Sequence, residues 1–145
     1  MSFLRIDDDL AEFVENAEEL IAAPAGEYTV QFLGFATNEE GGIEMTNRNG
    51  GAYLRPEFEI VDHPEEENFK SFSDYIGLPN DDMKLKAKKQ AAFKLNSFCK
   101  AFGIDLKNEI DPEEYIGNRA EVILSWKDDP EYGTQNGVKK FLKPA

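Results

Sequence analysis

The sequence has few of the residues that build disulfide bonds or metal sites. It contains one cysteine, Cys99, and one histidine, His63. One cysteine cannot close a disulfide within the chain, and one cysteine with one histidine cannot form a Cys/His metal cluster. We expect no metal and no cofactor. The cysteine content fits a reducing cytosol.

The sequence also lacks long apolar runs and an excess of positive charge. The opening residues, MSFLRIDDDL, show no apolar signal-peptide region, and no stretch reaches the roughly 18 apolar residues of a membrane span. We expect neither export by that route nor membrane insertion. With 16 Lys and Arg against 29 Asp and Glu, the formal net charge is −13, which disfavours nonspecific binding to membranes or duplex DNA. Any polyanionic partner must therefore meet a local basic patch.

The composition is that of one globular domain with an uneven charge distribution. At 145 residues and 41% hydrophobic content, the chain has room for one core. Residues 1–25 carry seven acids and one base, and residues 26–80 carry eleven acids and three bases. Residues 81–145 carry eleven acids and twelve bases. Lysine is thus concentrated in the C-terminal half, either as solvated surface or as a binding face.

The first element expected is an amphipathic helix over residues 7–21. Its apolar residues recur at helical spacing, and three aspartates suit its N-terminus. The apolar positions are Leu10, Phe13, Val14, Ala17, Leu20 and Ile21. Pro24 and Gly26 end the helix. We expect two parts, an acidic helix in residues 1–23 and a domain over residues 24–145.

The rest of the chain predicts strands around one further helix. Strands are expected at 27–35, 52–61, 69–76, 119–127 and 138–142, the first central and curved, and a glycine-rich hairpin arm or open loop at 36–51. Pro56 indicates an edge or a bulge. A helix at 81–103 is capped by Asp81 or Asp82 and ended by Gly103, and the Asn136-Gly137 pair favours a tight reversal. The order α-βββ-α-ββ predicts a mainly β fold: a five-stranded OB-fold Greek-key barrel with an extra N-terminal helix.

Four stretches of the sequence resemble a family of small bacteriophage single-stranded DNA-binding proteins. They are PAGEYTVQFLGF, KLNSFCKAFGID, EEYIGNRAEVILSW and NGVKKFLKPA. The resemblance covers residue 24 to the end and involves structural motifs without a catalytic signature. It implies an OB-fold that coats single strands during phage replication or recombination in the host cytoplasm. In contrast to many such proteins, the acidic segment lies at the N-terminus and the chain ends in lysines.

No residue pattern indicates an enzyme. The sequence shows no nucleophile with a base, no metal cluster and no phosphate-binding loop. His63 is expected in a solvent-exposed turn, and Cys99 on the apolar stripe of the second helix, where a buried structural thiol is expected. The acidic runs at 7–9 and 65–67 lack the spacing of a calcium loop.

Single-stranded DNA binding requires cations along the phosphates and aromatic rings on which bases stack, and the strands carry both. Phe32, Phe58 and Phe141 are expected in the core. The candidate DNA-binding residues are Arg48, Tyr53, Arg55, Lys70, Trp126, Lys127, Tyr132, Lys139 and Lys140. Tyr53 and Arg55 are expected on one face of their strand. The lysines of the second helix are expected to serve solubility, since that helix covers the far end of an OB barrel.

Two functions from different classes follow. The first is a nonenzymatic protein, monomer or homodimer, that binds and protects single-stranded DNA with low sequence specificity and contacts replication or recombination proteins through its acidic N-terminal helix. The second is an acidic protein-interaction module or DNA mimic that binds no nucleic acid. Binding to a labelled oligonucleotide separates them.

Overall fold

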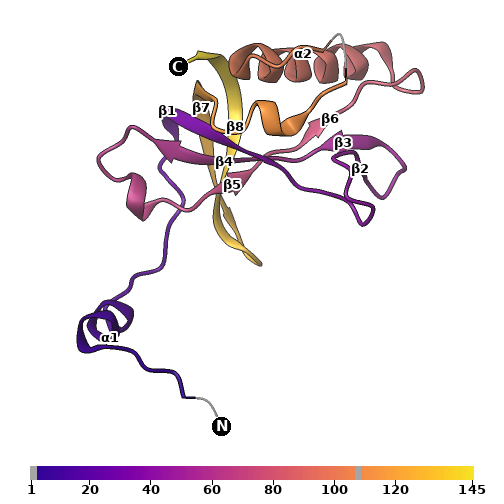
Figure 1. Ribbon diagram of the computed structural model, residues 1–145. Helices are drawn as coiled ribbons and strands as arrows, with labels where there is room; N and C mark the ends of the chain where they lie inside the picture. Colours follow the sequence, from indigo (N-terminus) through magenta and orange to yellow (C-terminus); the bar gives the residue numbers. More distant parts are fainter. Residues whose placement is uncertain (1–2, 107–108) are drawn as a thin grey trace.

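The structure is a computed structural model that describes residues 3–106 and 109–145. Within that part of the chain it is mainly β, with two α-helices and eight strands in two antiparallel sheets (Figure 1). The elements are α1 (Asp8–Glu15), β1 (Gly26–Phe35), β2 (Met45–Thr46), β3 (Ala52–Leu54), β4 (Pro56–Val61), η1 (Glu66–Asn68), β5 (Phe72–Ser73), β6 (Ile76–Gly77), α2 (Leu85–Phe102), η2 (Pro112–Glu114), β7 (Arg119–Asp129) and β8 (Gly133–Pro144).

The larger sheet has the order β5-β4-β1-β7-β8, with β1 at its centre as expected. Both faces of β1 carry apolar side chains, and the strand bends where its register with β4 shifts between Phe32 and Gly34. The expected five-stranded OB-fold barrel is not confirmed: among the described residues the sheet does not close, because the edge strands β5 and β8 share no ladder. The predicted fold class, mainly β with helices, is confirmed.

A polar cluster joins the two edges where the ladder is missing. Asp74, which follows β5, forms an ion pair with Lys94 of α2 at 3.1 Å, and Lys94 Nζ also donates to the carbonyl of Tyr75 at 2.6 Å. Burial raises the pKa of the Asp74 carboxyl, while Lys94 and the backbone amides of Tyr75 and Val138 lower it in part. Val138 belongs to β8, so one side chain connects both edges and α2.

The second and third expected strands are each divided between the two sheets. Strand 52–61 breaks at Arg55, directly before Pro56, so β3 enters the small β2-β3-β6 sheet and β4 the large one. Proline lacks the N–H group that would continue a ladder, which explains the break. The sequence indicated an edge or a bulge at Pro56, whereas the structure divides the strand there. The segment expected as strand 69–76 likewise gives β5 and β6, separated by Asp74 and Tyr75.

The glycine-rich segment 36–51 is a hairpin arm and not an open loop. β2 pairs with β3, and two asparagines shape the turns on either side of β2. Asn38 Oδ1 accepts from the amides of Glu40 and Gly42, and Asn47 Oδ1 accepts from those of Asn49 and Gly51. In these turns the asparagine side chains, instead of a longer β2–β3 ladder, bond the backbone amides.

The core is a cluster of phenylalanines between the sheet and the C-terminal half of α2. Phe32, Phe58 and Phe141 are buried as expected. Phe98 and Phe102 of α2 complete the cluster, and the Phe58 and Phe102 rings stack with centroids 5.4 Å apart. α2 ends at Gly103 as expected, in the left-handed region at φ 72°, but neither Asp81 nor Asp82 caps it. Its N-cap is Lys84, and Asp81 instead pairs with Lys88 at 2.7 Å.

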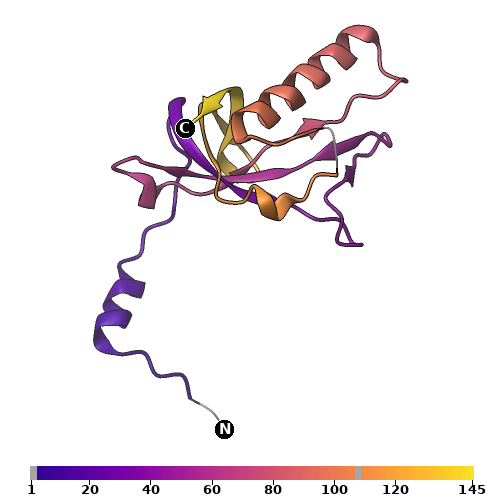
Figure 2. The ribbon, with the colours of Figure 1, turned by 45° about the horizontal axis from the view of Figure 1, so that its top comes forward.

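α1 is shorter than predicted and lies apart from the sheets (Figures 1 and 2). Asp7 caps it by accepting from the amide of Leu10 at 2.7 Å, and it ends at Glu15 instead of residue 21. The residues expected to form the end of the helix, 21–23, instead contact the rest of the domain. Ile21 forms a bridge with Phe69, and Ala23 is fully buried. The segment 21–23 therefore packs with the domain.

The last hairpin is longer than predicted and turns elsewhere. The reversal lies at 130–132, where Asp129 accepts from the amides of Glu131 and Tyr132 at 2.8 and 3.0 Å. The Asn136-Gly137 pair is inside β8, which corrects the predicted turn. The Asn136 side chain is buried and bonds both backbone groups of Ala23, at 2.9 Å from N and 2.8 Å from O. This tertiary contact overrides the local turn preference of the pair.

Candidate nucleic-acid interface

Two of the predicted cations meet in an open pocket beside edge strand β5. Arg55 and Lys70 both line this pocket of about 350 Å³, and the β8 residue Gln135 lines it as well. Arg55 Nε donates to Ser73 Oγ at 3.0 Å, which fixes the guanidinium against β5. The full lining is Arg55, Glu57, Lys70, Ser71, Phe72, Ser73, Gln135 and Asn136. With one acid against two bases the lining carries a net positive charge.

A tyrosine pair is formed by Tyr53 of β3, two residues before Arg55, and Tyr75, which lies between β5 and β6. The Tyr53 and Tyr75 rings stack with centroids 4.4 Å apart and planes at 27°. Asn47 of the arm donates from Nδ2 to the Tyr75 hydroxyl at 3.1 Å, so the arm holds the pair in place. Tyr53 is half-buried, whereas 47% of Tyr75 is exposed. Tyr75 is therefore the more accessible ring, although sequence reasoning selected only Tyr53.

The signal for Tyr75 was present in the sequence but was not decisive. Tyr75 comes two residues after Ser73 and is an aromatic residue in a strand-rich segment. The contact between Tyr75 and Tyr53 depends on the break between β5 and β6, which turns the Tyr75 ring toward Tyr53. Arg48, another predicted contact, is exposed near the end of the same arm, beside Asn47.

The β7–β8 hairpin brings Trp126 toward the same region. Trp126 pairs across the ladder with Asn136, which lines the cation pocket, and its side chain is 45% exposed. Directly opposed residues of an antiparallel pair share one face of the sheet. Trp126 therefore shares a face of the hairpin with Asn136, next to the pocket but outside its lining.

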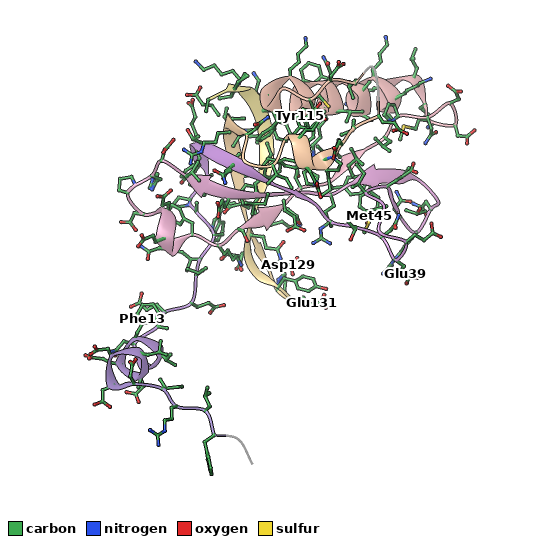
Figure 3. All side chains as sticks on the ribbon, in the orientation of Figure 1. Phe13, Glu39, Met45, Tyr115, Asp129 and Glu131 are labelled. Atoms are coloured by element: carbon green, nitrogen blue, oxygen red, sulfur yellow. The ribbon has the colours of Figure 1, made fainter. Side chains whose placement is uncertain are left out.

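The tip of this hairpin is acidic. Lys127 and the exposed Tyr132 lie there together with Asp128, Asp129 and Glu131. The amides of Glu131 and Tyr132 lower the pKa of Asp129, which keeps its carboxylate charged. Figure 3 shows Asp129 and Glu131 projecting at the end of the hairpin, away from α2. The tip of the hairpin therefore repels phosphate.

Lys139 and Lys140 lie in a different place from the other predicted cations. They line a pocket of about 230 Å³ between β8 and α2, together with Phe93, Lys94, Ser97, Val138 and Phe141. The local cause is a register shift in β8, which leaves two consecutive lysines exposed. The predicted set is therefore divided between two surfaces.

Neither candidate reactive residue stands in a reactive arrangement. Cys99 is buried as expected, and burial raises the pKa of its thiol to about 11. His63 is half-buried between the rings of Tyr28 and Phe69, at 5.5 and 5.2 Å, and its Nδ1 accepts from the amide of Glu65. This corrects the expectation of a solvent-exposed histidine, because two neighbouring rings cover it.

The described residues also offer no metal cluster and no helix that could span a membrane. Across 3–106 and 109–145, His, Cys, Asp and Glu do not gather in threes that could hold an ion. In the same ranges, neither helix is long and apolar enough to cross a bilayer. What the arrangement offers is a small cationic pocket with accessible rings beside it.

Comparison with models of known protein families and with curated proteins finds no match to this chain.

Proposed function

We propose that this chain is a nonenzymatic OB-fold protein that binds single-stranded DNA with low sequence specificity. Its proposed contacts are Arg55 and Lys70, with Tyr75 and Trp126 as stacking rings. The sequence resemblance extends the proposal to the protection of single strands during phage replication or recombination in the host cytoplasm.

The strand order supports the OB-fold part of the proposal. An OB-fold is a partly open five-stranded Greek-key barrel that binds oligonucleotides on strands 2 and 3 and on the loops after strands 1 and 4. Here β4 and β5 take the places of strands 2 and 3, and β7 and β8 those of strands 4 and 5. With the order β5-β4-β1-β7-β8, a barrel would close between the edge strands β5 and β8, where Asp74 connects the two edges.

The observation that carries the DNA-binding proposal is the grouping around the 350 Å³ pocket. Arg55, directly before β4, and Lys70, before β5, can neutralise neighbouring phosphates. The Tyr53–Tyr75 pair and the exposed Trp126 ring offer π-faces on which bases can stack. Stacking and phosphate contact carry little base information, so low sequence specificity follows.

Trp126 allows a direct test because it is the single tryptophan of the chain. Titration with an unlabelled oligothymidine should quench its fluorescence if a base stacks on the indole. Anisotropy of a labelled oligonucleotide gives the affinity in parallel. Tyr75→Ala should weaken binding by about 1 to 3 kcal/mol, roughly 5- to 150-fold, which is the range for one stacked base.

The cation contacts are tested through the salt dependence. Log affinity falls by about 0.7 per phosphate contact for each unit of log salt concentration on single strands. The double variant Arg55→Gln/Lys70→Gln should therefore flatten the slope by about 1.4. Lys86→Gln/Lys89→Gln is the matched control, because both lysines are exposed on α2 outside the pocket. An equal change in the control, or an absence of binding by the wild type, refutes the assignment.

A second candidate is the acidic protein-interaction module. The acidic hairpin tip and the net charge of −13 favour it. It predicts no quenching of Trp126 by any oligonucleotide at low salt.

A further inference from the structure

The N-terminal helix presents an uncovered apolar stripe on an acidic segment. Leu10, Phe13 and Val14, spaced as i, i+3 and i+4, are 47%, 73% and 56% exposed, and no residue of α1 is buried. Residues 3–23 carry seven acids and one base. Short helices in water depend on packing of their apolar face for stability. We therefore expect the apolar stripe to pack against another apolar surface. The negative charge of the segment favours a surface that carries basic residues.

The chain carries a surface of that kind on its opposite side, the groove between α2 and β8. Its floor is apolar, formed by Val138, Phe141 and Phe93, the last 69% exposed. Its polar rim is Ser97 with Lys94, Lys139 and Lys140, and no acid belongs to the lining. Lys94 is engaged by Asp74. In the described ranges no carboxylate lies within ion-pair distance of the other two lysines, so their charge is available to a partner.

The helix of the same chain is badly placed to fill this groove. Residues 16–20 join α1 to Ile21, whose backbone is fixed by bonds with Asn68 and Lys70 at 3.0 and 2.8 Å. From Glu15 to Ile21 the chain spans at most about 20 Å. Figures 1 and 2 both show α1 and α2 at opposite ends of the molecule, with the large sheet between them.

We propose that α1 of one chain docks in the α2–β8 groove of a second copy. The apolar side chains of α1 pack against Phe93 and Phe141, and its carboxylates face Lys139 and Lys140, as in other helix-in-groove contacts. Donor and acceptor surfaces differ, so the contact is heterologous and builds a ring or an open chain of subunits. The inference does not depend on DNA binding, since the groove is separate from the Arg55–Lys70 pocket.

Sedimentation velocity of the full chain over a concentration series tests the proposal. The wild type should assemble with rising concentration, and added salt should weaken assembly because the rim is electrostatic. Two variants should stay monomeric: Phe13→Ser/Val14→Ser, which removes the stripe, and Lys139→Glu/Lys140→Glu, which reverses the rim. Lys86→Glu/Lys89→Glu makes the same charge change elsewhere on α2 and should still assemble.

A mixing experiment separates this contact from docking within one chain. The stripe variant keeps an intact groove and the rim variant an intact helix, so their equimolar mixture should form dimers that grow no further. All changed side chains are exposed, so each variant should keep the wild-type circular dichroism melt. If the rim variant melts at a lower temperature than the wild type, Phe93→Ser, which changes the apolar floor of the groove, takes its place in the experiment. A wild type that is monomeric at every concentration, or a rim variant that assembles like the wild type, overturns the proposal.

Discussion

Asn136 joins the segment after α1 to the last hairpin, and its replacement tests how this fold is held together. Its Oδ1 accepts from the amide of Ala23, and its Nδ2 donates to the carbonyls of Ala23 and Ser125 at 2.8 and 2.9 Å. Ala23 is fully buried, so water does not replace these bonds. In Asn136→Ala, a buried N–H and a buried C=O lose their partner.

We expect Asn136→Ala to lower the free energy of unfolding by about 2 to 4 kcal/mol, because each buried group left unpaired costs about 1 to 3 kcal/mol. Urea denaturation followed by circular dichroism measures this loss. Gln135→Ala, the exposed neighbour on β8, is the control and should change stability by less than about 0.5 kcal/mol. A loss for Asn136→Ala within that same range would refute the reasoning.

Asn136→Asp sharpens the test through its pH dependence. The new carboxylate cannot donate to the two carbonyls, and burial beside them raises its pKa in the folded state. A raised folded-state pKa means that the folded protein favours the protonated form of the new side chain over its carboxylate. The deficit in stability relative to the wild type should therefore be smallest below about pH 4 and should grow as the pH rises through the folded-state pKa. A deficit that does not vary with pH would place the side chain in solvent.

Two further predictions concern buried ionisable groups. Lys94→Met leaves the Asp74 carboxyl, whose pKa burial already raises, without its cation; with Lys94 partly exposed, we expect a loss of about 1 to 2 kcal/mol in urea denaturation at pH 7, and a smaller one at pH 4, where the carboxyl protonates. An equal loss at both pH values would exclude this cause. Cys99, with a pKa raised to about 11, should react with iodoacetamide at pH 8 far more slowly in the native protein than in urea; equal rates would show an accessible thiolate.

The sequence by itself determined the elements that depend on local patterns. Aromatic and β-branched alternation predicted β1 and β7, and Gly103 fixed the end of α2 because its backbone adopts a left-handed φ. Pro56 indicated an edge or a bulge, but not that its strand would be divided between two sheets. The burial of Phe32, Phe58 and Phe141 followed from apolar residues in strands. Such features depend on residues within a few positions of each other.

The tertiary structure decided which of these elements meet. Asn136 belongs to a turn by local preference but lies in β8, because its side chain bonds a residue 113 positions away. The same long-range order places Arg55 with Lys70 in one pocket and moves Lys139 and Lys140 to another. It also pairs Tyr75 with Tyr53 through the break between β5 and β6. Periodicity gives each residue a face on its own element, whereas the position of that face in the molecule depends on strand pairing between distant segments.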